Sequence, residues 1–312
     1  MNGQNWTLST EIVLLGFQHL QNYRIPIFIL FLLLYIFTVL ANFLIIILVS
    51  SSHNLHSPMY CFLCHLSFSD ILLTTNTVPN MLLVILKQGT MNLRACITQG
   101  YIFALSLSAE CLLLTVMSYD RYLAICKPLH YSSIMDNTFH IKLVSGTWLL
   151  GSLSPIVTDV LAAKLHFCGV VKMDHFYCDF ASLLELSCSD THAVKFSNIL
   201  SAAPLTIVPV IFITATYVHI FQTILKIPSK IKIQKAFSTC SSHLTVVCIF
   251  YGTVVTLYVF PATGYSLIAN KILSLLYTVV TPLLNPIIYS MRNHEIRAAL
   301  QKFINGRTVM KM

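Results

Sequence analysis

The ionisable residues that lie in or at the ends of long apolar stretches set the range of chemistry to consider. Asp70 and Glu110 each lie in the middle of such a stretch, and Asp120 and Arg121 close the stretch that holds Glu110. Two facing carboxyl groups could support aspartyl-type hydrolysis, but only if their helices met at one depth. A charged pair ending an apolar stretch instead marks where a helix leaves the membrane, with Arg121 reaching toward water.

Hydrolytic and metal chemistry find little further support. The sequence has no H-E-x-x-H, no G-x-S-x-G, and no second aspartate in a span opposite Asp70 in the arrangement that aspartyl chemistry uses. His175, Cys178 and Asp179 are close in sequence but lack a second Cys or His at ligand spacing, so we expect no metal site. A transporter would show two matching halves, and no internal symmetry is evident. We expect a protein that is not an enzyme and keep a membrane transporter as the alternative.

The composition requires a membrane. The 312 residues are 56% hydrophobic and only 10% charged, which a water-facing surface could hardly tolerate. The net charge is +8, and twelve of the nineteen Lys and Arg residues fall on the side that we assign to the cytosol, as the positive-inside rule requires. This charge predicts topology and attraction to membrane lipid. It does not indicate nucleic-acid binding, because no basic soluble domain is present.

Seven apolar runs, each near the ~20 residues that a membrane-spanning helix needs, follow one another along the chain. They cover residues 25–50, 58–84, 96–119, 143–163, 196–225, 237–260 and 272–291. We therefore predict an all-α membrane protein with a seven-helix bundle over residues 25–291. Residues 1–24 would be an extracellular segment, and residues 292–312 a cytosolic tail with a short amphipathic helix at the membrane surface.

The extracellular side offers two kinds of covalent modification. Asn5-Trp6-Thr7 is a glycosylation sequon before the first span, so a glycan is expected on Asn5. Cys96, Cys168, Cys178 and Cys188 lie on the oxidising side, where disulfides form. Four cysteines allow three pairings, and the residues alone leave these open.

Several phrases of the sequence resemble those of rhodopsin-like G-protein-coupled receptors, and of the olfactory receptors in particular. They are LHSPMY at 55–60, M-x-Y-D-R-Y-x-A-I-C at 117–126, KAFSTCxSHL at 235–244 and PLLNPIIY at 282–289. The chain departs from the family in having Ala41 where Gly is usual, and its tail lacks a cysteine for a palmitoyl anchor. The resemblance implies a receptor in the plasma membrane of olfactory sensory neuron cilia. It would bind a volatile odorant and activate a stimulatory, olfactory-type heterotrimeric G protein that raises cyclic AMP; a non-olfactory chemosensory receptor is an alternative.

The resemblance also implies residue roles. The odorant would contact Phe103, Ala104, Leu107, Ser108 and Cys111 in the third span, Ser201, Ala202, Leu205 and Thr206 in the fifth, Tyr251, Val254, Val255 and Tyr258 in the sixth, and Thr278 in the seventh. G-protein coupling and switching would involve Asp120, Arg121, Tyr122, Tyr217, Lys235 and Tyr289. A polar network of Asn42, Asp70, Glu110 and Asn285 could hold water or a sodium ion near the two carboxyl groups, and no other cofactor is expected. The disulfides would be Cys96–Cys178 and Cys168–Cys188.

The chemistry of these residues indicates the kind of ligand. The third-span positions lie on one helix face, and none of the proposed contacts carries a formal charge. Receptors for amine transmitters carry an aspartate where this chain has Phe103, so a permanent cation would be desolvated without a counter-ion. A small neutral odorant is therefore expected. Lys195, Lys271 and Asp159 near the extracellular ends could admit a charged ligand only if the site lies higher.

Overall fold

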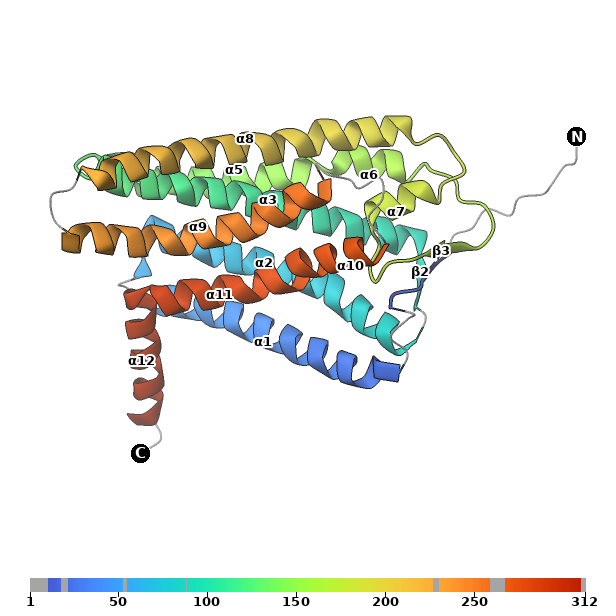
Figure 1. Ribbon diagram of the computed structural model, residues 1–312, viewed down its shortest axis with the longest axis horizontal. Coiled ribbons are helices and arrows are strands. Elements are labelled where there is room, and N and C mark those ends of the chain that lie inside the picture. The colour runs from blue at the N-terminus through green and yellow to red at the C-terminus, as the bar shows by residue number, and fades with distance from the viewer. Residues whose placement is uncertain are drawn as a thin grey trace, which may run out of the picture.

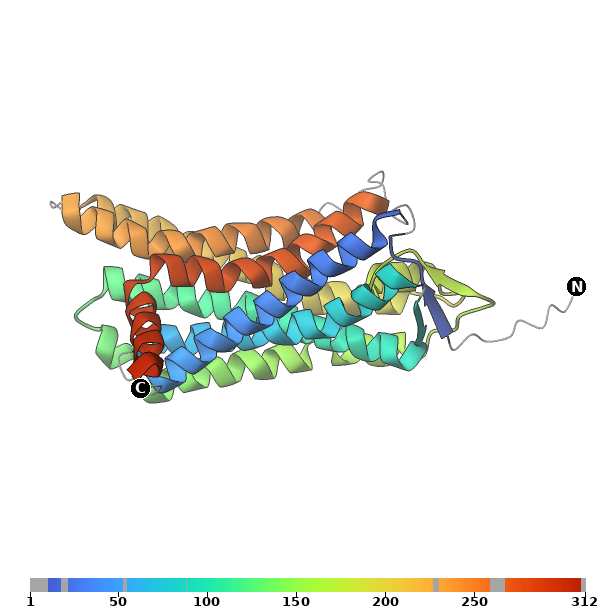
Figure 2. The ribbon, with the colours of Figure 1, turned by 90° about the horizontal axis from the view of Figure 1, so that it is seen from below.

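The computed structural model describes residues 11–17, 22–52, 55–87, 89–226, 230–258 and 267–309. Asn5, the expected glycosylation site, lies outside these residues. Long helices run side by side along one axis, and one further helix, α12 (His294–Val309), crosses the end of the bundle (Figures 1 and 2).

The long helices follow the predicted spans in number and order. They are α1 (Arg24–Ser51), α2 (Pro58–Leu86), α3 (Leu93–Cys126), α5 (Asn137–Leu153) with α6 (Ile156–Ala162), α8 (His192–Leu225), α9 (Lys230–Tyr258), and α10 (Leu267–Leu275) with η3 (Leu276–Val280) and α11 (Thr281–Arg292). Six of the described helices are long and apolar enough to cross a membrane, and α9 has a shorter apolar part, His243–Val254. The predicted seven-helix membrane bundle is confirmed.

The third helix extends beyond both predicted ends. It begins at Leu93, where the Asn92 side chain accepts a hydrogen bond from the Arg94 amide at 2.9 Å and so caps the first turn. It continues past Arg121 to Cys126 and ends beside Lys127, because the residue before a proline, here Pro128, avoids helical geometry. Arg121 therefore lies inside the last turns of α3, and the helix continues for five residues beyond it.

The fourth and seventh spans are interrupted where proline removes a backbone donor. Residues 143–163 were predicted as one run, but the helix begins at Asn137 and breaks before Pro155. In the seventh span, the turn Leu276–Val280 is π-helical and lies just before Pro282. The Thr281 hydroxyl donates to the Leu276 carbonyl oxygen, five residues back, at 3.1 Å and supports this wide turn.

The sixth helix begins seven residues before the predicted start at 237. Residues 230–236, KIKIQKA, are mostly good helix formers and include three lysines. Hydropathy locates the part of a helix that lies in the membrane and misses a polar extension of this kind.

A small sheet at the extracellular end was not predicted. Strand β1 (Glu11–Leu14) lies between β2 (Gly89–Asn92), to which it is antiparallel, and β3 (Val171–Met173), to which it is parallel. Ile12 and Leu14 are buried while Glu11 is exposed, which is the two-residue period of a half-buried strand. Part of the N-terminal segment is thus built into the extracellular loops.

The predicted tail helix is present as α12 and is fixed to the bundle at its start. The Tyr60 hydroxyl on α2 donates to Glu295 Oε2 at 2.7 Å and lies 3.1 Å from Asn293 Oδ1. Ile296 is buried, whereas Ile304 is 55% exposed on the apolar face of the helix. α12 turns away from α11 at a steep angle in both views, as expected of an amphipathic helix that lies along the membrane surface (Figures 1 and 2).

Candidate functional site

Asp120 and Arg121 form a closed cluster at the cytosolic end of α3. Arg121 donates to Asp120 Oδ2 from Nη2 at 2.5 Å and from Nε at 3.1 Å, so its side chain bends back along the helix. The Tyr131 hydroxyl, on the short loop helix α4 (Tyr131–Ile134), donates to Asp120 Oδ1 at 2.7 Å. Burial and the neighbouring Asp120 carboxylate raise the pKa of Tyr131, so its phenol remains a donor. Both Asp120 oxygens are therefore satisfied, and Tyr131 is a partner that the sequence prediction missed.

A second cluster joins three helices through His243. Its Nε2 lies 3.1 Å from the Leu114 carbonyl oxygen on α3, and its Nδ1 lies 2.6 Å from the Tyr217 hydroxyl on α8. A carbonyl oxygen only accepts, so Nε2 carries the proton and Nδ1 accepts from Tyr217 in the neutral ring. The prediction included Tyr217 but missed His243, although KAFSTCxSHL contains it.

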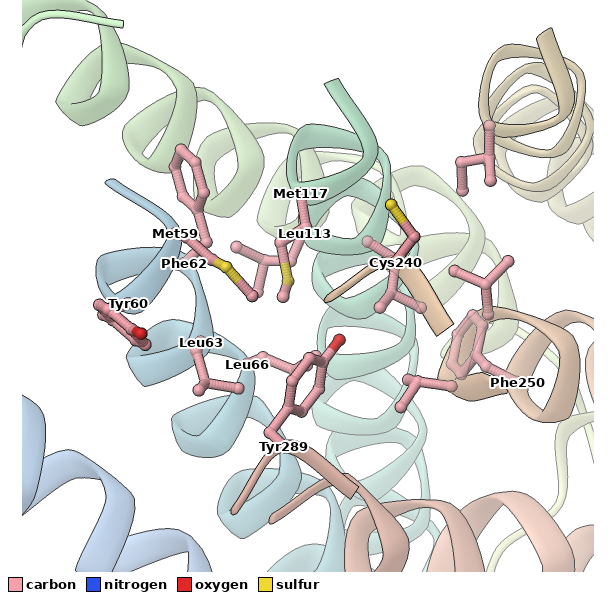
Figure 3. Close-up of a cluster of buried hydrophobic side chains, with 14 of the residues drawn as sticks. Met59, Tyr60, Phe62, Leu63, Leu66, Leu113, Met117, Cys240, Phe250 and Tyr289 are labelled. Atoms are coloured by element: carbon pink, nitrogen blue, oxygen red, sulfur yellow. The ribbon is translucent and has the colours of Figure 1, made fainter. Parts of the chain in front are cut away.

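Tyr289 points from α11 into the largest apolar cluster, beside Leu63, Leu66 and Met117 (Figure 3). Its side chain is 1% exposed, and its hydroxyl has no hydrogen-bond partner among the described residues. Leaving a buried hydroxyl unpaired costs about 1–3 kcal/mol. A conformation that gives Tyr289 a partner would recover this free energy.

Two other predicted coupling residues lie near the cytosolic side. Tyr122 is half-buried, stacks on Tyr119 with ring centroids 6.4 Å apart, and has Lys127 Nζ 6.0 Å from its ring centroid. Lys235 belongs to α9, but its side chain lies outside the described residues.

The predicted polar network is brought together only in part. Asn285 Nδ2 donates to both oxygens of Asp70 at 3.0 Å. Asn42 was expected to pair with Asp70; its Nδ2 instead donates to the backbone oxygens of Thr38 at 3.1 Å and Pro282 at 3.0 Å. Pro286 has no N–H to donate to the carbonyl four residues earlier, so the Pro282 carbonyl oxygen is left for Asn42 to bind.

Three buried oxygens of this network have no partner among the described residues. They are Asn42 Oδ1, Asn285 Oδ1 and Glu110 Oε1. Asp70 and Glu110 are close enough for their charges to interact. Carboxylate and amide oxygens are the ligands that hard cations and water take, so the donor set suits either.

The upper part of α3 carries the residues predicted to face the odorant. Phe103, Ala104, Leu107 and Ser108 are half-buried, and Cys111 is buried. Ser108 Oγ lies 3.4 Å from Ser154 Oγ at the break between α5 and α6. The prediction placed no fourth-span residue near the site, and this contact adds one.

A hydrogen bond between α3 and α9 closes the cytosolic end of the predicted odorant-facing side of α3. The Tyr251 hydroxyl donates to the Cys111 carbonyl oxygen at 3.0 Å and joins α9 to α3. Val254 and Thr278 are buried, and the Thr278 hydroxyl donates to the Ser274 carbonyl oxygen at 2.7 Å. The side chains of Val255 and Tyr258 lie outside the described residues.

The predicted residues of the fifth span are less enclosed. Ser201, Leu205 and Thr206 are half-buried, and the two hydroxyls donate to carbonyl oxygens of their own helix at 3.1 and 3.0 Å. Ala202 is exposed and does not belong to the packed interior that holds Cys111 and Thr278.

Two disulfides hold the loop between the fourth and fifth spans. Cys96 is joined to Cys178 and Cys168 to Cys188, with Cα atoms 5.3 and 6.1 Å apart, which is the pairing that the resemblance implied. Gln99, which the sequence analysis missed, accepts from the Cys178 amide at 2.9 Å and donates to the Asn76 carbonyl oxygen at 2.6 Å. The loop is thus fixed to α3 at two adjacent points.

Lys271 at the start of the seventh span fastens the N-terminal segment to this loop. Its Nζ donates to the Gly16 carbonyl oxygen at 2.7 Å and to Asp174 Oδ1 at 2.6 Å, and its side chain is 8% exposed. Gly16 has φ +60°, and a Cβ there would lie against Val84, so only glycine fits this turn. Neighbouring His175 adds no charge, because burial lowers its pKa.

Lys271→Met is expected to release residues 11–17. It removes an ion pair and a charge-assisted hydrogen bond at once, and such bonds contribute about 1.5–3 kcal/mol each. Amide hydrogen exchange of residues 11–17 should therefore accelerate by at least about tenfold. Lys195→Met, at an exposed lysine on the same side, is the control and should leave exchange unchanged. Equal exchange in both variants would contradict the role given to Lys271.

The bundle, the D-R-Y cluster at its cytosolic end and the stapled extracellular loop together define a seven-helix receptor. A family model described as olfactory receptor matches residues 31–307. The chain is 45% identical to olfactory receptor 11A1 of Homo sapiens over 295 residues, covering 95% of this chain and 94% of the relative. It is 43% identical to olfactory receptor 5P55 of Mus musculus over 305 residues, covering 97% and 98%. The chain belongs to the olfactory receptor family.

Membership of this family establishes the general function of the protein. The protein is a multi-pass membrane receptor for odorants that acts through a G protein, and it is not an enzyme. The kind of odorant, the type of G protein and the roles of single residues go beyond the family.

Proposed function

We propose that the chain binds a small neutral volatile compound within the upper half of the bundle and activates a stimulatory G protein that raises cyclic AMP. The observation that carries the ligand class is the uncharged, hydroxyl-bearing face of α3 from Phe103 to Cys111, closed below by Tyr251. The remaining proposed contacts are Ala104, Leu107 and Ser108 on α3 and Ser201, Leu205, Thr206, Val254 and Thr278 on the other spans. Val255 and Tyr258 are included from the sequence alone.

The charges near this face support a neutral ligand. Lys271 is already paired with Asp174 and the Gly16 carbonyl oxygen, so it is not available to an anion without breaking both bonds. Glu110 precedes Cys111, but neighbouring residues point about 100° apart on a helix, and it belongs with Asp70. Affinity then comes mainly from apolar burial, at ~25 cal/mol per Å², with one or two hydrogen bonds to orient the ligand.

The cytosolic residues supply the switch in this proposal. At rest Arg121 is held by Asp120, and outward movement of the sixth span would free it to contact the G protein together with Tyr122 and Lys235. The unpaired Tyr289 hydroxyl supports a second conformation in which it gains a partner. Water or a sodium ion between Asp70 and Glu110 would stabilise the resting state, since it would satisfy the three unpaired oxygens. Placement in olfactory sensory cilia belongs to the same proposal.

The test is a chemically spread odorant panel applied to cells that express the chain, with and without the stimulatory α subunit. Neutral compounds should raise cyclic AMP only when the subunit is present. Ser108→Ala should raise the half-maximal concentration of the best agonist about fivefold, the worth of one hydrogen bond. Ser152→Ala, on a half-buried serine of α5 whose hydroxyl donates to the Leu149 carbonyl oxygen, is the matched control and should have no effect. A best agonist that is a quaternary ammonium or a dicarboxylate would contradict the ligand class.

A further inference from the structure

Helix α8 continues through two prolines, and each of them leaves one carbonyl oxygen without its usual helical donor. Pro209 has no N–H for the Leu205 carbonyl oxygen, and Pro204 has none for that of Leu200. A helical carbonyl oxygen lies beside the backbone nitrogen four residues later, so the position of the proline locates the oxygen. Pro209 is buried, whereas Pro204 is exposed and Leu200 is 66% exposed. The Leu205 oxygen therefore lies on the inner face of α8, and the Leu200 oxygen on its outer face.

The Leu205 carbonyl oxygen differs from its neighbours along the helix. The carbonyl oxygens of Ala202 and Val210 each accept from a threonine hydroxyl of α8, at 3.0 and 2.7 Å. No side chain of the described residues donates to Leu205 in this way. An acceptor without its donor is unfavourable in an apolar interior, and a ligand that supplies a donor recovers that free energy.

Two contacts between α3 and α8 give the depth of this oxygen. Ser118 Oγ lies 2.5 Å from Thr216 Oγ1, and Cys126 Sγ lies 3.2 Å from Thr223 Oγ1. The paired residues are 98 and 97 positions apart in the chain. Both helices run from the extracellular to the cytosolic end with the same rise per residue. A residue of α8 is therefore level with the α3 residue about 98 positions before it.

This offset places Leu205 at the depth of Ser108, within the α3 face proposed for the odorant. Above this level, Tyr177 of the extracellular loop stacks on Phe103 with ring centroids 5.6 Å apart. Below it, Tyr251 joins α9 to α3. A ligand between these two levels has the hydroxyl of Ser108 on one helix and the carbonyl oxygen of Leu205 on another.

We propose that the Leu205 carbonyl oxygen, freed by Pro209, makes the receptor prefer odorants that carry a hydroxyl group. The inference rests on the odorant site proposed above. An alcohol or phenol donates to the Leu205 oxygen and accepts from Ser108, because a hydroxyl group does both. A ketone, aldehyde or ester only accepts, so it leaves the Leu205 oxygen without a donor. Pro209 is thus a specificity-determining residue that acts through the backbone.

The preference is measured with pairs of a secondary alcohol and the ketone of the same carbon skeleton, which differ in the donor and little in shape. The parent chain should respond to the alcohol at a half-maximal concentration about fivefold lower, the contribution of one hydrogen bond. Equal responses to alcohol and ketone would overturn the role of Leu205 and leave the odorant site in place. A parent chain that responds to no neutral compound would refute the odorant site itself, and the inference with it.

Pro209→Ala supplies the missing N–H, so the helix itself takes the Leu205 carbonyl oxygen. The half-maximal concentration of the alcohol should rise about fivefold, to that of the ketone, while the value for the ketone stays the same. Pro204→Ala is the matched control, since it makes the same change on the outer face and should keep the preference. A change in the bend of α8 shifts both compounds together, so the ratio of alcohol to ketone isolates the acceptor.

Val208→Thr fills the same oxygen while Pro209 stays in place. Val208 is 62% exposed, and Ser201 and Thr216 of this helix already donate to the carbonyl oxygen three residues back. This variant should also lose the preference, and it decides the test if Pro209→Ala does not reach the cell surface. Ser108→Ala should weaken alcohol and ketone alike, because both accept from it. A preference for the alcohol that persists when the Leu205 oxygen is filled would contradict the proposal.

Discussion

Arg121→Ala is expected to abolish the odorant-evoked rise in cyclic AMP while surface expression stays measurable. In the proposed function Arg121 is the side chain that α3 presents to the G protein. At rest Arg121 is the cationic partner of a fully buried carboxylate, Asp120, whose other oxygen is taken by Tyr131. Removing a partner from a buried charge is destabilising by about 3–5 kcal/mol, so some loss of stability accompanies the loss of signalling.

Two further variants separate signalling from stability. Asp120→Asn/Arg121→Ala removes the uncompensated carboxylate, so thermal stability should recover while the cyclic AMP response remains absent. Arg94→Ala replaces an exposed arginine at the other end of α3 and should signal normally. A chain that still signals fully with Arg121→Ala would show that this residue is only an anchor at the membrane surface.

Breaking the Cys96–Cys178 disulfide is expected to have the second large effect. By chain entropy, the Cys96–Cys178 bond, which closes a loop of 82 residues, stabilises the fold by about 4.5 kcal/mol, and the Cys168–Cys188 bond, which closes 20 residues, by about 3 kcal/mol. The Cys96–Cys178 bond also holds the loop to α3 beside Gln99 and positions Tyr177. Cys96→Ser/Cys178→Ser should therefore lower thermal stability and raise the agonist's half-maximal concentration by more than tenfold, a shift of about 1.4 kcal/mol.

The comparison variant is Cys168→Ser/Cys188→Ser, which removes a crosslink inside the extracellular loop and leaves the attachment of that loop to α3 intact. Its agonist response should change less, because Cys178 and Gln99 still fix Tyr177. Thermal inactivation of purified receptor and concentration–response curves measure both variants. An equal loss in the two would mean that the attachment to α3 has no special part in the site.

Most of the bundle could be predicted because crossing a membrane imposes a length and a polarity on each helix. Its ends could not, since they depend on local capping and on polar extensions. α3 is capped by Asn92 and begins three residues before the apolar run, and α9 begins at Lys230 in a polar stretch. The irregular turns near Pro155 and Pro282 depend on how neighbouring helices satisfy the freed backbone groups.

Candidate site residues could be predicted where a sequence phrase contains them, and less well where a loop brings them in. Asp120, Arg121 and Tyr217 belong to helices whose positions hydropathy and motifs define. Tyr131 and Tyr177 reach the site from loops, so their partners, Asp120 and Tyr277, depend on tertiary contacts that no local pattern encodes. The strand Glu11–Leu14 did carry a signal, the short apolar run that begins at Ile12, but four residues are too few to separate it from chance.

The central claim is that an odorant bound by this chain drives nucleotide exchange on a stimulatory G protein. The direct measurement is guanine-nucleotide exchange by the purified heterotrimer with the receptor in lipid nanodiscs, with and without a neutral volatile agonist. The agonist should accelerate exchange with the parent chain and with Arg94→Ala, and should have no effect with Arg121→Ala. An exchange rate that the agonist leaves unchanged, with uptake of the compound into vesicles that carry the chain, would contradict the account and indicate a transporter.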